Sequence, residues 1–89
     1  METVHLVIKG KVQGVYYRAS AKEKANELGI KGWIKNTPRG HVEVMASGSK
    51  EQLEKFMEWC RQGPKYADVS DMIVTKVEQE NFNDFSIKK

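Results

Sequence analysis

The segment from Gly10 to Arg18 has the residue types of an anion-binding turn. It contains two glycines, Gly10 and Gly14, and it ends with an arginine at the start of an expected helix. The first N–H groups of a helix have no intrahelical partner and carry positive character, so such a turn can direct several amides at one anion. A guanidinium at this position is electrostatically misplaced unless an anion binds beside it, and its shape matches two phosphate oxygens. The residues alone also fit an ordinary strand–helix turn followed by a solvated arginine.

The elements that must position this turn follow from the hydrophobic pattern. Alternating apolar residues predict strands over 3–9, 30–36, 41–46, 69–77 and 82–87. Apolar spacings of three and four predict a helix over 17–28, which ends at Gly29. A second helix is expected to begin after Ser49, because Ser49 and Gln52 form a capping box, and to end at Gly63.

This order of elements predicts an α+β protein with a ferredoxin-like split βαβ sandwich. The pattern βαββαβ, plus a short last strand, is expected to give one mainly antiparallel sheet with both helices on one face. Eighty-nine residues leave room for one hydrophobic core. We therefore expect a single domain over residues 1–89, with its site in a shallow loop cleft.

Composition excludes several classes of protein. The chain is 39% hydrophobic and 30% charged, and its 15 basic and 12 acidic residues are interspersed, giving a formal net charge of +3. No stretch approaches the ~18 apolar residues of a membrane span, and the first residues do not resemble a signal peptide. Cys60 is the one cysteine, so no internal disulfide can form and a cytoplasmic location is expected. His5 and His41 lack the spacing of a metal site, so we expect neither metal nor cofactor.

Two longer stretches together resemble the signatures of the acylphosphatase family. The residues Val12–Arg18 (VQGVYYR) are similar to the first signature. The residues Gly32–Val42 (GWIKNTPRGHV), with Gly48 following, are similar to the second. The stretches 59–64 (WCRQGP) and 85–87 (FSI) are also similar to that family, so the likeness covers nearly the whole chain. Tyr17 stands where the family usually has Phe, and Ile34 where it usually has Val; both are expected to be packing positions.

This resemblance implies a hydrolase that converts acyl phosphates into carboxylate and inorganic phosphate without a metal. By position, Arg18 would hold the phosphate and Asn36 would orient the attacking water, with Thr37 in a secondary role. The family's phosphate-binding loop corresponds to backbone groups of the residues Gln13, Gly14, Val15, Tyr16 and Tyr17. The expected partner is a small-molecule acyl phosphate, with no nucleic acid or membrane, and the enzyme is expected to be a monomer.

Two other functions fit the same fold. RNA-binding RRM domains share the βαββαβ order, but no segment here carries their aromatic RNP1 pattern. A non-catalytic domain that senses phosphate is also compatible with the scaffold, because fold does not imply function. An acylphosphatase-like segment also occurs in larger carbamoyl-transferring maturation proteins, and the short chain favours a standalone enzyme over one of these.

Overall fold

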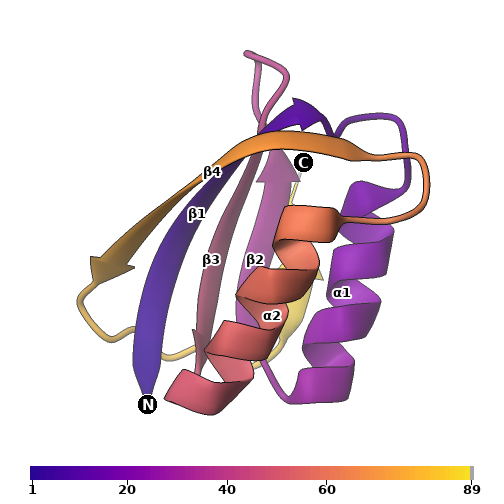
Figure 1. Cartoon of the computed structure of the whole chain (residues 1–89). Helices are drawn as coiled ribbons and strands as arrows, with labels where there is room; N and C mark the ends of the chain where they lie inside the picture. Colours follow the sequence, from indigo (N-terminus) through magenta and orange to yellow (C-terminus); the bar gives the residue numbers. More distant parts are fainter. Residues whose placement is uncertain (89) are drawn as a thin grey trace.

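The computed structural model, which describes residues 1–88, contains one five-stranded sheet with both helices packed on one of its faces (Figure 1). The sheet has the order β4-β1-β3-β2-β5, and each neighbouring pair is antiparallel except β2 and β5, which are parallel. The predicted ferredoxin-like arrangement is confirmed. The elements are β1 (Glu2–Lys11), α1 (Tyr17–Leu28), β2 (Lys31–Asn36), β3 (Val42–Gly48), α2 (Lys50–Gln62), β4 (Asp68–Val77) and β5 (Phe85–Ile87).

The core lies between the sheet and the two helices. Each helix buries one narrow face, made of Tyr17, Ala21 and Ala25 in α1 and of Leu53, Phe56 and Cys60 in α2. From the sheet, the buried side chains come mainly from alternate positions of β1, β2 and β3: Val4, Leu6, Ile8, Ile34, Val42, Val44 and Ala46. Burial raises the pKa of the Cys60 thiol to about 12, so this cysteine is an unreactive core residue, as its helical position predicts.

The two helices begin in different ways. The side chain of Ser49 accepts a hydrogen bond from the Gln52 N–H, and Gln52 Oε1 accepts one from the Ser49 N–H, so α2 has the predicted capping box. By contrast, α1 begins after Tyr16 with no side-chain cap and no acidic residue in its first turn. The amides at the start of α1 are therefore left for another partner.

A β-bulge in β4 lies opposite the end of β1, where Lys9 pairs with Asp71 and Gly10 with Val69, so that Ser70 is the extra residue. The pairing register between β1 and β4 shifts between Lys9 and Gly10. Gly10 has φ 117°, and a Cβ at this position would collide with the backbone carbonyl of Asp68. Only glycine combines this φ with such a close approach. Gly10 therefore lets the backbone of β4 pass close to the end of β1, just before the loop that leads to α1.

The last strand is shorter than the sequence predicts. The expected strand over 82–87 is wrong at its beginning, since β5 starts at Phe85. Asn83 and Asp84 form a bend, which agrees with the preference of Asn and Asp for turns. The carbonyl of Asp84 still accepts a hydrogen bond from Gly32 N at 2.8 Å, so the bend ends where pairing with β2 begins.

The face of the sheet away from the helices carries a polar cluster. His5 Nε2 and Glu43 Oε2 lie 2.6 Å apart, and Lys35 Nζ lies 3.5 Å from the other oxygen of Glu43. The hydrogen bond with His5, followed by the charges of Lys35 and His5, lowers the pKa of Glu43.

Within residues 1–88, no helix is both long and apolar enough to cross a membrane.

The Glu43 cluster should make the stability of the fold depend on acidity. A carboxyl whose pKa is lower in the folded state stabilises the fold above its unfolded pKa, here about 4.5, and this contribution is lost as the pH falls further. Replacing Glu43 with Gln should therefore weaken the acid dependence of the free energy of unfolding, by less than about 1 kcal/mol for such a partly exposed pair. Urea unfolding at pH 7 and pH 3.5 measures the difference. The exposed Glu54→Gln is the control, and an unchanged acid dependence in Glu43→Gln would contradict the assignment.

Candidate active site

An open pocket of about 370 Å³ lies between the β1–α1 loop and the ends of β2 and β5. Arg18 enters it from the first turn of α1, and Asn36 enters it from the last residue of β2. The structure thus brings together the two side chains that the resemblance singles out. The lining residues are Val12, Gly14, Tyr16, Tyr17, Arg18, Ala19, Asn36 and Ile87.

The loop before α1 has the backbone geometry of an anion-binding nest. Gly14 and Tyr16 have φ of 74° and 61°, whereas Val15 between them does not have positive φ. Such alternation of φ turns successive N–H groups toward a common point, where they can bind an anion. A Cβ built on Gly14 would meet no atom within 4 Å, so the loop is open at this position. Together with the uncapped start of α1, this geometry offers several amides to one ligand.

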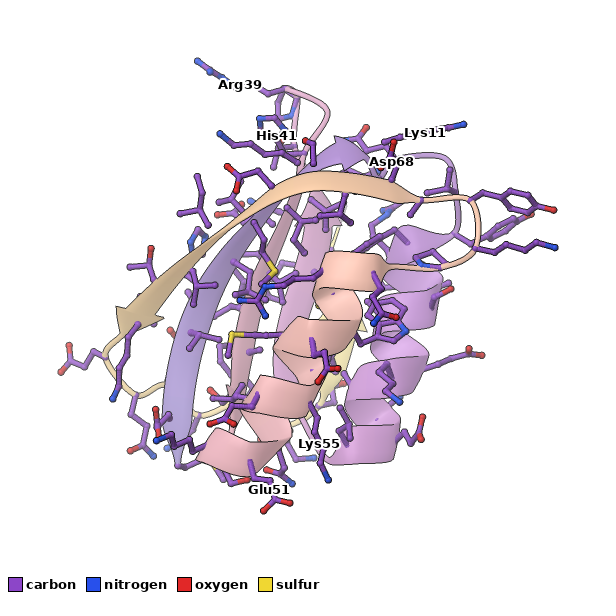
Figure 2. All side chains as sticks on the ribbon, viewed as in Figure 1. Lys11, Arg39, His41, Glu51, Lys55 and Asp68 are labelled. Atoms are coloured by element: carbon purple, nitrogen blue, oxygen red, sulfur yellow. The ribbon has the colours of Figure 1, made fainter. Side chains whose placement is uncertain are left out.

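Arg18 is the guanidinium of this site. The residue is half-buried and lines the pocket together with Gly14, Tyr16 and Tyr17 of the loop and helix start. The other arginine of the signature stretches, Arg39, is exposed in the β2–β3 turn, and its side chain points away from the molecule (Figure 2). The two arginines are therefore not equivalent, and only Arg18 adds its charge to the pocket.

The side chain of Asn36 has an unused acceptor. Its Oδ1 is buried and forms no hydrogen bond with any atom of residues 1–88. A buried acceptor without a partner typically costs about 1–3 kcal/mol, so a folded protein rarely keeps one without a reason. An oxygen that the protein leaves free is available to accept a hydrogen bond from a water molecule that enters the pocket.

The side chain of Gln13 connects the loop to the β2–β3 turn. Gln13 Nε2 donates to the carbonyl of Thr37 at 2.9 Å and to the carbonyl of His41 at 2.8 Å. These two carbonyls flank the turn that follows Asn36, so one carboxamide holds the β1–α1 loop and the Asn36 strand at a fixed separation. The sequence suggested only a backbone role for Gln13, and no local pattern reveals this long-range contact.

Three other expected site residues have structural partners. The side chain of Val15 is buried in the core, so only its backbone can face a ligand. Thr37 lies in the turn, where its hydroxyl accepts a hydrogen bond from His41 N at 3.2 Å. The buried Tyr17 lines the pocket with its ring, but its hydroxyl donates to the carbonyl of Cys60 at 2.6 Å. Burial raises the pKa of Tyr17 far above its usual value of 10, so this phenol cannot serve as a base.

The sequence analysis did not identify Ile87 as a pocket residue. It lies at the end of β5, which pairs in parallel with β2 so that Ile87 is opposite Ile34. This pairing brings a residue from the end of the chain next to the loop after β1. A motif search along the sequence gives no signal for such a contact, because the contact depends on the order of strands in the sheet.

Among residues 1–88, no group of three or more His, Cys, Asp or Glu side chains is arranged to hold a metal ion.

Comparison with known proteins identifies the family. The acylphosphatase family profile matches residues 4–87. The chain belongs to the acylphosphatase family. An acylphosphatase of Marinobacter nauticus is 48% identical over 82 residues, which span 91% of this chain and 89% of the relative. An acylphosphatase of Methylococcus capsulatus is 49% identical over 80 residues, which span 84% of this chain and 87% of the relative.

Solved structures of acylphosphatases have the same fold. The acylphosphatase from Bacillus subtilis superposes with a TM-score of 0.97 over the full length of both chains, at 32% identity. The acylphosphatase from Coxiella burnetii gives a TM-score of 0.94 at 37% identity and covers 98% of this chain and 92% of its own. Full-length HypF shares the fold, with a TM-score of 0.88 at 22% identity, but this chain matches only 12% of its length.

The Gln13 contacts predict a positioning role that substitution can test. Replacing Gln13 with Met keeps the length of the side chain but removes both donors. The two carbonyls keep backbone partners, Gly40 N for Thr37 and Thr37 N for His41, so the loss of stability should be only about 1 kcal/mol. Because the loop is no longer held to the β2–β3 turn, kcat for acyl phosphate hydrolysis should fall by about 10–100-fold.

Two further variants make this test specific. Gln13→Glu would direct carboxylate oxygens at two carbonyl oxygens, so it should be at least as impaired as Gln13→Met. Gln62→Met changes an exposed glutamine at the end of α2 and should leave kcat unchanged. Full turnover by Gln13→Met would show that the two hydrogen bonds do not position the site.

Proposed function

We propose that this chain hydrolyses the carboxyl–phosphate bond of acyl phosphates, with Arg18 and the loop amides binding the phosphate and Asn36 orienting the attacking water. The observation that carries the proposal is the shared pocket. A guanidinium, an uncapped helix start with alternating φ before it, and a carboxamide with a free acceptor all border the same space. Membership of the acylphosphatase family supports the same activity.

The chemistry suits these groups. An acyl phosphate has a stable carboxylate as its leaving group, so little acid catalysis is needed to expel it. The enzyme must mainly position the reactants and neutralise the charge on the phosphoryl oxygens. The guanidinium supplies two donors in a fork, and the backbone N–H groups of residues 13–17 supply the rest. Asn36 then holds one water in line with the phosphorus, opposite the leaving carboxylate.

The proton of the attacking water needs an acceptor other than the protein. The pocket lining, as far as residues 1–88 form it, contains neither a carboxylate nor a histidine, and the Tyr17 hydroxyl is engaged with Cys60. Arginine is always protonated, and a carboxamide is not a base. We therefore assign the proton to a phosphoryl oxygen of the substrate itself. No step of this reaction requires a metal or a cofactor.

The cellular setting is part of the proposal. We propose that the enzyme acts as a monomer in the cytoplasm, on a small-molecule acyl phosphate and not on nucleic acid or a membrane. The buried, unpaired thiol of Cys60 fits a reducing compartment. Light scattering of the purified chain and fractionation of cells that express it would test these two points.

Substitution of the two polar side chains should have contrasting effects. Arg18→Ala should lose most activity because phosphate binding weakens, so inhibition by inorganic phosphate should also weaken. Asn36→Ala should lower kcat by about 10²–10³-fold while phosphate still inhibits nearly normally. Asn36→Ala should cost little stability, because it removes a buried acceptor that has no partner among residues 1–88. Steady-state kinetics with benzoyl phosphate in the presence of a chelator, together with thermal unfolding, measures all of these effects.

Matched variants separate function from general damage. Arg39→Ala removes the same charge from the exposed turn, and Asn26→Ala removes a carboxamide from the exposed side of α1. Both should keep wild-type kinetics. If Asn36→Ala turned over substrate at the full rate, Asn36 would not orient the water.

The proposed proton transfer also predicts the pH dependence of turnover. Imidazoles, and carboxylates whose pKa the site has raised, are the usual general bases of enzymes near neutral pH, and neither type lines the pocket within residues 1–88. We expect kcat at saturating substrate to stay constant between about pH 6 and pH 8. A bell-shaped profile whose acidic limb disappears on substitution of a carboxylate would instead identify a general base in the protein.

A further inference from the structure

The proposed function gives a role to the polar groups that line the pocket, which bind the phosphate and the water, but it gives none to the apolar side chains in the lining. Three of the apolar lining residues contribute little accessible surface or little bulk: Val12 and Tyr17 are each 1% exposed, and Ala19 carries only a methyl group. The other two, Tyr16 and Ile87, are 81% and 39% exposed. The accessible apolar surface beside the pocket therefore belongs mainly to Tyr16 and Ile87.

Tyr16 has a conformation that folding alone does not explain. Within residues 1–88, it is the one non-glycine residue with positive φ (φ 61°, ψ 23°). This left-handed conformation disfavours a bulky side chain, and Gly or Asn would adopt it more easily. The side chain does not cap α1, and its high exposure means that it contributes little to the core. Backbone strain of this kind is typical of functional sites.

Ile87 is held in place although it lies near the end of the chain. Its neighbour Lys88 donates its backbone N–H to the carbonyl of Ile34 at 2.8 Å, which continues the parallel pairing of β5 with β2. Asn36 follows two residues after Ile34 on the same strand. The sheet thus fixes Ile87 at the same pocket as Asn36. The pocket that contains the proposed water-positioning residue therefore also has an exposed apolar side chain in its lining.

An acyl phosphate has two ends with opposite requirements. The phosphoryl group carries the charge and needs donors, whereas the acyl group is joined to it through one bridging oxygen and can be apolar. When the phosphoryl group lies against Arg18 and the loop amides, the acyl group must extend along another part of the pocket. Transfer of an apolar ligand group from water to a contact with aromatic and aliphatic side chains lowers the free energy and so favours binding.

We propose that Tyr16 and Ile87 form the contact for the acyl group and make the enzyme prefer acyl phosphates whose acyl group is aromatic or a bulky hydrocarbon. This inference rests on the proposed function and adds the substrate class to it. The pocket is open to solvent, so the preference is for apolar contact and not for one enclosed shape. A small acyl group such as acetyl reaches the same phosphate site but gains little from this surface.

The test compares benzoyl phosphate with acetyl phosphate. For each variant, the specificity ratio is kcat/KM for benzoyl phosphate divided by kcat/KM for acetyl phosphate. Tyr16→Asn removes the ring and keeps a residue that accepts positive φ, and Ile87→Thr removes apolar surface but keeps a β-branched side chain for the strand. We expect the specificity ratio to fall by about tenfold in Tyr16→Asn and by about threefold in Ile87→Thr.

Controls separate this inference from the proposed function. Tyr66→Asn removes a tyrosine that is 67% exposed and does not line the pocket, so it should leave the ratio and both rates unchanged. If Tyr16→Asn and Ile87→Thr keep the wild-type ratio, or lose activity equally on both substrates, the acyl-contact assignment is wrong while the hydrolase assignment stands. If the wild type hydrolyses neither substrate, the proposed function itself is wrong. Should Tyr16→Asn unfold, Ile87→Thr decides the question alone.

Discussion

The start of α1 without a capping side chain is the feature on which the site depends. A helix leaves its first N–H groups unpaired, and most helices satisfy them with a side chain or with water. This chain does so for α2, where Ser49 and Gln52 exchange hydrogen bonds. It does not do so for α1, whose N-cap residue is Tyr16. The difference between two helices of similar length is the main physical argument for our proposal that the amides before and within α1 bind a ligand.

The rest of the fold holds this helix start opposite Asn36. Sheet topology alone brings the end of β1 and the end of β2 to the same end of the molecule, since β3 lies between the two strands and is antiparallel to both. The two hydrogen bonds of Gln13 then fix the distance between the β1–α1 loop and the β2–β3 turn. Figure 2 shows Arg39 and His41 of this turn at the same end of the molecule as Lys11, where β1 ends. These cross-links hold the two sides of an open pocket at a fixed separation.

Much of the fold could be predicted from the sequence, and the reasons are local. Both helices have strong end signals, so the predicted range of α1 and the capping box of α2 are confirmed. The beginning of β5 was predicted three residues too early, because the apolar Phe82 precedes a bend at Asn83 and Asp84 that interrupts the strand. The gathering of Arg18 and Asn36 at one pocket agrees with the resemblance, but their roles stay predictions. The contacts of Gln13 and the position of Ile87 depend on strand order and turn geometry, which no short window of sequence encodes.

The two positions at which the sequence differs from the usual family pattern, Tyr17 and Ile34, are both buried in the core, as expected of packing positions. Ile34 is fully buried, and its partner in the parallel register is the pocket residue Ile87. Tyr17 adds a hydroxyl to a position that is usually Phe, and a buried hydroxyl needs a partner. The carbonyl of Cys60 supplies it, near the end of α2, where backbone carbonyls lack helical partners. The bond joins the start of α1 to the end of α2, where the ring of Tyr17 also packs against Trp59, with ring centroids 5.5 Å apart. The extra oxygen therefore has its partner in the scaffold and is not directed at the pocket.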